Sequence, residues 1–323
     1  MRILALTFAS LATSLAASDF RLGFPVDCNL GEDCFIQNYV DQDAGQDYQD
    51  FSCGRLSYDG HKGTDFAVAT HREALHGVAI LAAAPGQVRA IRESITDHFL
   101  DKPMAFPEGQ DCGNGVVIRH EDGWETQYCH LKLGSIQVQA GQQVEAGTVL
   151  GEIGMTGRTE FPHLHLSVRH QGNVIDPFNP EGLALCDTTG TPLPETLWND
   201  SISYEAGGLL DAGFAFGLPE FNHIKWGDAH YPHITAEQGA LVLWAYVFGG
   251  IAGDALTLTI EGPDGVFSEQ TVVLERTQAQ LMRASGRRLH AENTVPGDYT
   301  GTVVLMREGE EIDRLTATTE LRE

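Results

Sequence analysis

The feature that most constrains the fold is the spacing of short apolar runs between turn residues from about residue 61 to 178. Runs such as "GVVIRH", "WETQYCHL" and "HLHLSVRH" are of strand length and are separated by Gly, Asp and Asn turns. This spacing is typical of antiparallel strands. The piece "VQAGQQVEAGTVLGEIG" adds Val138, Val144 and Leu150 around repeated Ala-Gly turns. We therefore expect a mainly β protein whose first domain is an antiparallel β-roll with lipoyl-barrel-like hairpins.

The remaining composition divides the chain into further regions. With 323 residues and 42% hydrophobic content, the chain can bury two cores. We assign residues 61–183 to the β-roll domain and residues 236–323, with their Pro-Asp-Gly turns, to a small immunoglobulin-like β-sandwich without a catalytic cluster. Residues 184–235 are expected to be a linker that packs on the domains. Residues 19–60 are expected to be an irregular segment held by disulfides.

The first 18 residues have the layout of a secretory signal peptide. One Arg precedes a short apolar stretch and then small residues, with cleavage expected near Ala16 or Ser18. The stretch is too short for a membrane span, and no later stretch is long and apolar enough. We therefore expect an exported protein, periplasmic or secreted, without an integral membrane span.

The formal net charge of −25 excludes one class of partner. A strongly acidic surface repels nucleic acid and anionic lipid, so no nucleic-acid partner is expected. The charge leaves the oligomeric state open.

The six cysteines form an even set in a chain expected to be exported, which favours disulfides. Zinc ligation by cysteine is the alternative, but the sequence contains no Cys-x-x-Cys pair. The pieces "GNGVVIRH", "EDG" and "WETQYCHL" predict a strand, a tight turn and a strand. Folding that hairpin brings Cys112 opposite Cys129, so we predict a bridge between them.

Two of the thirteen histidines stand near each other in one strand-like run, "EFPHLHLSVRHQG". Residues i and i+2 of a strand face the same side, about 6.6 Å apart at ~3.3 Å per residue. His163 and His165 therefore share a face, and Leu164 and Leu166 take the buried one. One imidazole can then bind a metal while the other approaches a water bound to it. The alternative is a surface pair on an edge strand, which the preceding Pro162 also fits.

In "GHKGTDF", His61 and Asp65 are four residues apart and flanked by Gly60 and Gly63. The glycines allow a tight turn that aims an imidazole and a carboxylate at one point. Both groups are good zinc ligands, at about 2.0–2.2 Å. The alternative is a loop histidine beside a solvated aspartate.

In "TQYCHL", His130 ends the second hairpin strand, with Tyr128 expected on the same face. The alternative is a cross-strand polar residue. The piece "HIKWGDAHYPHI" contains three more histidines close together. They could form a second metal site, but a solvated linker is the favoured interpretation. The histidines without a functional assignment are His71, His76, His98, His120, His170, His223, His230, His233 and His290.

Taken jointly, the motifs resemble the lysostaphin-type, or LytM-domain, zinc metalloendopeptidases over residues 55–178. The motifs "HKGTD", "YCHL" and "GEIGMTGRTEFPHLHL" stand in family order, which is far more specific than a lone His-x-His. The resemblance implies one Zn²⁺ per chain held by His61, Asp65 and His165. It implies acid and base work for the two auxiliary histidines, His130 and His163.

The implied function is that of an exported zinc metalloendopeptidase that hydrolyses peptide bonds in peptidoglycan cross-links or bridges. In the expected mechanism His163 takes the proton of the attacking water and His130 stabilises the oxyanion, or the two roles are reversed. One alternative is a non-catalytic LytM-like cell-wall binding or regulatory module, but such modules lack zinc ligands that this sequence retains. Another is a secreted zinc-binding adhesion protein, which would hold metal without hydrolysis.

Overall fold

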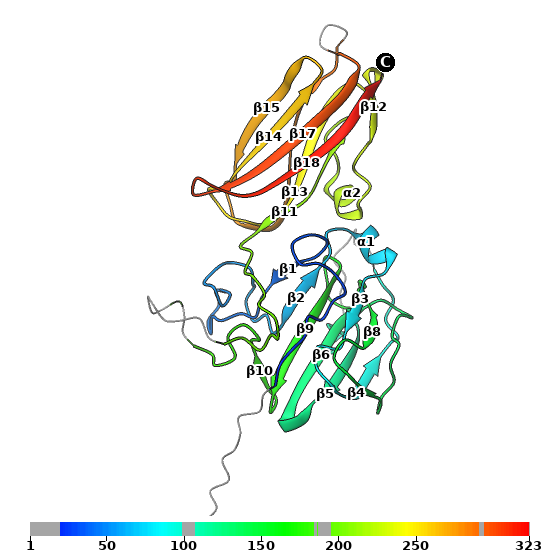
Figure 1. The fold of residues 1–323 in the computed structure, drawn as a ribbon, viewed down its shortest axis with the longest axis vertical. Coiled ribbons are helices and arrows are strands. Elements are labelled where there is room, and N and C mark those ends of the chain that lie inside the picture. Colours follow the sequence, from blue (N-terminus) through cyan, green and yellow to red (C-terminus); the bar gives the residue numbers. More distant parts are fainter. Residues whose placement is uncertain (1–19, 99–106, 184–185, 187–194, 291–293, 323) are drawn as a thin grey trace, which may run out of the picture.

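The computed structural model describes residues 20–98, 107–183, 186, 195–290 and 294–322. The signal peptide expected at residues 1–18 lies outside the described residues. The chain forms two β-rich parts that lie end to end, with two short helices near the junction (Figure 1). The prediction of a mainly β protein is confirmed. Within the described ranges, no helix is long and apolar enough to cross a membrane.

The first part is built on an eight-stranded sheet with the order β1-β2-β9-β6-β5-β4-β7, in which β10 also pairs with β9. All of these pairings are antiparallel. Strands β3 and β8 form a separate two-stranded sheet. The elements are β1 Phe35–Asn38, β2 Thr64–Ala67, α1 His71–His76, β3 Ala79–Leu81, β4 Gly86–Arg92, β5 Asn114–Arg119, η1 Glu121–Gly123, β6 Trp124–Leu131, β7 Gln143–Val144, β8 Val149–Glu152, β9 His163–His170 and β10 Asn173–Ile175.

Strand β9 lies inside this sheet, between β2 and β6, and one of its faces packs on the core of the first part. Leu164 and Leu166 on that face have no exposed surface. Val138, Val144 and Leu150, placed by the sequence around the Ala-Gly turns, are also buried in the same core. The apolar alternation of the sequence therefore fixes which side of β9 the histidines can occupy.

The predicted hairpin and its disulfide are confirmed. Strands β5 and β6 pair across the short η1 turn, where Asp122 and Gly123 take left-handed backbone angles. Cys112 and Cys129 are bonded, as expected. The other cysteines form the bridges Cys28–Cys34 and Cys53–Cys186.

The segment before residue 61 is more ordered than expected. Its disulfides are present, but "FIQN" forms β1, which pairs with β2 at the edge of the sheet. The strand has only four residues and contains a bulge between Ile36 and Asn38. Its sequence therefore shows no alternation of apolar and polar residues from which the strand could have been predicted.

The second part contains a three-stranded sheet, β11-β13-β16, and a five-stranded sheet, β12-β18-β17-β14-β15. One apolar core is shared by residues of both sheets, as in a β-sandwich. Its elements are β11 Gly208–Ala215, α2 Phe221–Trp226, β12 His233–Thr235, η2 Ala236–Gln238, β13 Ala240–Gly250, β14 Ala255–Gly262, β15 Gly265–Val273, β16 Gln278–Arg288, β17 Gly297–Arg307 and β18 Glu310–Arg322.

The expected linker at residues 184–235 contains part of this sandwich, which corrects the sequence assignment. Strand β11 is an edge of the three-stranded sheet and pairs with β13 along its whole length. The sequence "GLLDAGFA" hides this strand because a bulge between Leu209 and Asp211 breaks its alternation. Trp198, also in this range, is buried in the core of the first part.

Side chains of the two parts pack directly against each other at the junction. The rings of Phe35 in β1 and Phe248 in β13 lie 4.6 Å apart. Gln37 donates a hydrogen bond to the Ala279 carbonyl and accepts one from the Gln280 side chain. The sandwich therefore holds β1, the edge strand of the first part.

Arg307 anchors the sandwich at this junction, and we expect Arg307→Met to lower the free energy of unfolding by about 3–5 kcal/mol. Its guanidinium binds both carboxylate oxygens of Asp254 and the carbonyls of Ala206 and Gly249. Asp254 is 2% exposed, so the substitution leaves a buried, unpaired carboxylate. Urea denaturation followed by fluorescence measures the loss.

The matched control for this substitution is Arg314→Met. Arg314 pairs with Glu311 in an exposed ion pair, so water replaces the lost contacts and stability should hardly change. Equal losses in the two variants would contradict the assignment of Arg307 as an anchor.

Candidate functional site

Three side chains converge on one point in the first part. Nε2 of His61 lies 3.2 Å from Oδ1 of Asp65 and 3.1 Å from Nδ1 of His165, and Nδ1 of His165 lies 2.8 Å from the same Asp65 oxygen. His61 and Asp65 are each 2% exposed, while His165 is half-buried. These three residues form the cluster of metal-ligating atoms that the sequence predicts.

Strand register brings the three together. Asp65 in β2 stands directly opposite His165 in β9. His61 precedes β2 in the turn that the sequence indicates, with its backbone N–H donating to the Tyr58 carbonyl. Gly63 is required between them, because a Cβ there would lie 2.6 Å from Nε2 of His165.

The outer hydrogen bonds of both histidines determine where their protons lie. Nδ1 of His61 donates to the Tyr39 carbonyl at 2.7 Å, so the neutral form of this ring has its lone pair on Nε2. The Ser167 hydroxyl donates to the Lys62 carbonyl, so at 3.1 Å it must accept a proton from Nε2 of His165. Nδ1 of His165 therefore also faces the cluster as a lone pair.

Asp65 completes the cluster as a third proton-free donor. Its Oδ2 accepts a hydrogen bond from the Asn38 amide at 2.9 Å, which directs Oδ1 to the two imidazoles. Burial opposes its ionisation, but the facing imidazoles of His61 and His163 outweigh burial and hold the pKa of Asp65 well below its usual range. Burial likewise lowers the pKa of His61, yet the Asp65 carboxylate reverses this and raises it.

Three converging lone pairs require a positive charge between them, either a shared proton or a cation. A tetrahedral zinc site with bonds of about 2.0–2.1 Å has donor separations of about 3.3–3.4 Å. The separations of 2.8, 3.1 and 3.2 Å are slightly shorter, so a small outward movement of the side chains would admit the ion. The donor set of two imidazoles and one carboxylate also suits zinc.

His163 lies beside this cluster, as the spacing in β9 predicts. Its Nδ1 donates to the Phe161 carbonyl at 2.9 Å, which leaves Nε2 as the acceptor, 3.5 Å from Oδ1 of Asp65. Burial lowers the pKa of His163, although Asp65 opposes this. The hydrogen bond at Nδ1 therefore leaves Nε2 of His163 as the atom that can accept a proton.

His130 also lies at the site, but regular strand alternation does not place it there. Its ring lies 4.6 Å from that of His163 and 6.0 Å from that of His165, measured between centroids. Its Nδ1 donates to the Thr156 carbonyl at 2.8 Å. Burial, aided by His163 and His165, holds the pKa of His130 well below its usual range.

The expectation that Tyr128 and His130 share a face is wrong. Tyr128 pairs with Leu166 and is fully buried, with its hydroxyl bonded to the Ala83 N–H. Regular alternation would place His130 on the same core face, but His130 has a left-handed φ of 67°. This conformation disfavours a side chain by about 1–2 kcal/mol and turns the imidazole to the site instead.

The sequence did not identify the residues that orient the site. Ser167 follows His165 by two residues on the same strand face, and this spacing is a local signal that could have been used. Asn38 and the Tyr39 carbonyl come from β1 and the residue after it, and no local pattern connects them to His61. Tyr58, half exposed, places its ring 4.4 Å from that of His61 and was missed for the same reason.

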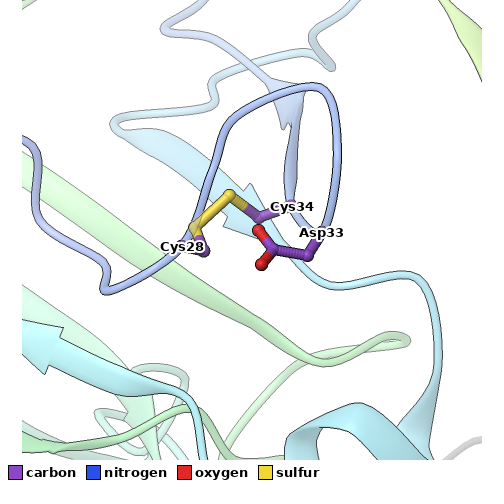
Figure 2. Close-up of side chains that lie close together, drawn as sticks. All are labelled: Cys28, Asp33 and Cys34. Carbon is purple, nitrogen blue, oxygen red and sulfur yellow. A yellow bond between two sulfur atoms is a disulfide. The ribbon is translucent and has the colours of Figure 1, made fainter.

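Two other groups of ligand-type side chains do not form comparable sites. Cys28, Asp33 and Cys34 lie together, but Figure 2 shows that the two sulfurs are joined in a disulfide and offer no thiolate. Among the residues that the structure describes, the three histidines of "HIKWGDAHYPHI" form no metal-ligand cluster. They have separate partners, which are Asp228 for His223, the Phe214 N–H for His230 and Glu320 for His233.

Comparison with known proteins covers the part of the chain that contains this cluster. Residues 59–177 match Peptidase family M23. The DD-carboxypeptidase/endopeptidase Mpg of Neisseria meningitidis is 42% identical over 94 residues, which make up 29% of this chain and 19% of that protein. The peptidoglycan DD-endopeptidase ShyB of Vibrio cholerae is 32% identical over 116 residues, 36% of this chain and 22% of that protein.

Among solved structures, the catalytic domain of lysostaphin from Staphylococcus simulans is 22% identical, with a TM-score of 0.28, and covers 43% of this chain and 85% of that chain. The chain spans about a fifth of the length of the two curated relatives. The match of residues 59–177 to Peptidase family M23 confirms the predicted resemblance.

We expect Asn38→Ala to weaken metal binding by about 10- to 100-fold, because the amide that directs the Asp65 carboxylate is lost. Competition for zinc against a chelator of known affinity measures the change. Asn173→Ala in β10 is the control, since that side chain is exposed and its affinity should match the wild type. Equal affinities for all three proteins would show that Asn38 does not orient the ligand.

Proposed function

We propose that the M23 domain is a zinc peptidase that hydrolyses peptide bonds in peptidoglycan, at cross-links or bridges. The observation that carries the proposal is the convergence of three ligand atoms, from His61, Asp65 and His165, beside the imidazoles of His130 and His163. Three protein ligands leave one tetrahedral position free, as a catalytic zinc site requires. The relatives named as peptidoglycan DD-endopeptidases supply the substrate class.

The chemistry that bound zinc would supply is Lewis-acid polarisation of the scissile carbonyl and acidification of a water. The protein's own part is to hold and move protons. His163 accepts the proton of the attacking water at Nε2, because its Nδ1 is committed to the Phe161 carbonyl. His130 faces the reacting atoms through Nε2, since its Nδ1 is committed to the Thr156 carbonyl, and it takes up a proton at Nε2 only as negative charge develops on the substrate oxygen.

We further propose that the protein works outside the cytoplasm. All six cysteines are paired in disulfides, which form and persist in oxidising compartments. The signal peptide expected at residues 1–18 provides the export route. The substrate class agrees with this location, because peptidoglycan lies outside the inner membrane.

The proposal predicts that purified sacculi incubated with the mature protein release soluble muropeptides, and that a zinc chelator stops the release. Restoring zinc should restore it. Mass spectrometry of the products identifies the bond that is cut. Binding to sacculi without chelator-sensitive release would overturn the proposal and favour a non-catalytic cell-wall module.

Substitution of the two β9 histidines should separate metal binding from proton transfer. We expect His165→Ala to lose both zinc and activity, because it removes a ligand. We expect His163→Ala to keep zinc and lose about 10²- to 10⁴-fold in kcat, the usual contribution of a positioned base. Zinc content by atomic emission and kcat on muropeptides test both, and a metal-free His163→Ala protein would contradict the division of roles.

A further inference from the structure

The position of His130 on the site face depends on an irregularity at the end of β6. Across the β6–β9 pairing, Cys129 stands opposite His165 and Tyr128 opposite Leu166. Across β5–β6, Gly115 pairs with Cys129 but Asn114 pairs with Leu131, so His130 is the extra residue of a bulge. Bulges of this kind redirect a side chain, and they persist only where the surroundings hold them.

Three hydrogen bonds hold His130 in its left-handed conformation. Its carbonyl accepts from the Gly154 N–H at 3.0 Å, and its Nδ1 donates to the Thr156 carbonyl at 2.8 Å. Its backbone N–H donates to the Cys112 carbonyl at 2.9 Å. The first two partners belong to one loop, so the third is the contact that ties His130 to the β5 side of the hairpin.

The acceptor of that third bond is covalently tied to the residue before His130. Cys112 is bonded through its sulfur to Cys129. Gly115 permits this close approach, because a Cβ there would lie 3.0 Å from the Cys112 sulfur and 2.5 Å from the Tyr128 carbonyl oxygen. The disulfide and the hydrogen bond from the His130 N–H to the Cys112 carbonyl therefore close one short ring, in which the disulfide limits how far the two backbone segments can separate.

We propose that the Cys112–Cys129 disulfide is a positioning element for His130 in the peptidase reaction. By fixing the Cys112 carbonyl against the His130 N–H, it keeps the bulge closed and the imidazole beside His163. The outer hydrogen bonds of the three proposed ligands come from Tyr39, Asn38 and Ser167 and not from Cys112 or Cys129, so the disulfide acts on proton handling and not on metal retention. This inference rests on the proposed function and adds to it the means by which one auxiliary histidine is held.

A double-mutant cycle tests this coupling. Cys112→Ser/Cys129→Ser is made in the wild type and in His130→Ala, and kcat, KM and zinc content are measured with soluble cross-linked muropeptides. In the wild-type background we expect kcat to fall by about 10²-fold, at the lower end of the contribution of a positioned acid or base, with zinc content unchanged. In the His130→Ala background, loss of the disulfide should change kcat less than twofold, because the group it positions is already absent.

The Cys28–Cys34 disulfide provides the matched control. It closes a loop in the segment before β1, so Cys28→Ser/Cys34→Ser should leave kcat unchanged in both backgrounds. Equal losses of kcat on removing Cys112–Cys129 from both backgrounds would show general structural support and overturn the inference. An unchanged kcat in the wild-type background would overturn it as well.

A second readout does not need activity. In the zinc-loaded protein with ¹⁵N-labelled histidine, the Nδ1 proton of His130 should exchange slowly because it is bonded to the Thr156 carbonyl. The signal is assigned by its absence in His130→Ala. We expect it to be lost in the variant without Cys112–Cys129 and kept in the variant without Cys28–Cys34. Its persistence in both variants would overturn the inference. If the serine pair does not fold, Cys112→Ala/Cys129→Ala takes its place.

The two readouts separate the two proposals. A wild-type protein that shows no chelator-sensitive hydrolysis refutes the proposed function, while the exchange measurement still decides whether the disulfide holds the imidazole. If the wild-type protein hydrolyses muropeptides but the losses of kcat from His130→Ala and from removal of the disulfide are additive, the positioning role is refuted and the proposed function stands.

Discussion

The convergence of three proton-free donor atoms on one point is the constraint around which the first part is arranged. Nε2 of His61, Oδ1 of Asp65 and Nδ1 of His165 repel one another unless a positive charge lies between them. The protein maintains this costly arrangement by burying two of the three side chains and by fixing each with an outer hydrogen bond. Such pre-organisation favours a cation over a single shared proton, since a divalent ion satisfies all three lone pairs.

That outer set of hydrogen bonds connects the site to the second part of the chain. The Asn38 amide and the Tyr39 carbonyl, which orient Asp65 and His61, lie at the end of β1. Among the strands that the structure describes, β1 pairs with β2 alone, and Phe248 and Gln280 of the sandwich contact its side chains. The sandwich thus contributes to the rigidity of the ligands without contacting them, which gives the accessory part a physical role independent of any substrate.

Much of the fold and site follows from local sequence patterns. The two-residue spacing of His163 and His165 determines that both face one side of β9, because Leu164 and Leu166 must take the core. The turn chemistry of "EDG" sets the β5–β6 hairpin, and the hairpin in turn places Cys112 beside Cys129. These features were predictable because each lies within one strand or one hairpin, where the periods of strands and turns apply.

The features that escaped prediction are those in which the backbone departs from its period or a contact spans the chain. His130 lies on the site face only because a bulge and a positive φ override alternation, and no side-chain pattern encodes that reversal. β11 was hidden by a bulge in the same way. Asn38 acts on Asp65 across 27 residues of sequence, through a pairing of two short strands that exists only in the folded sheet. Motifs therefore locate the proposed ligands, whereas the orientation of their side chains is a property of the tertiary structure.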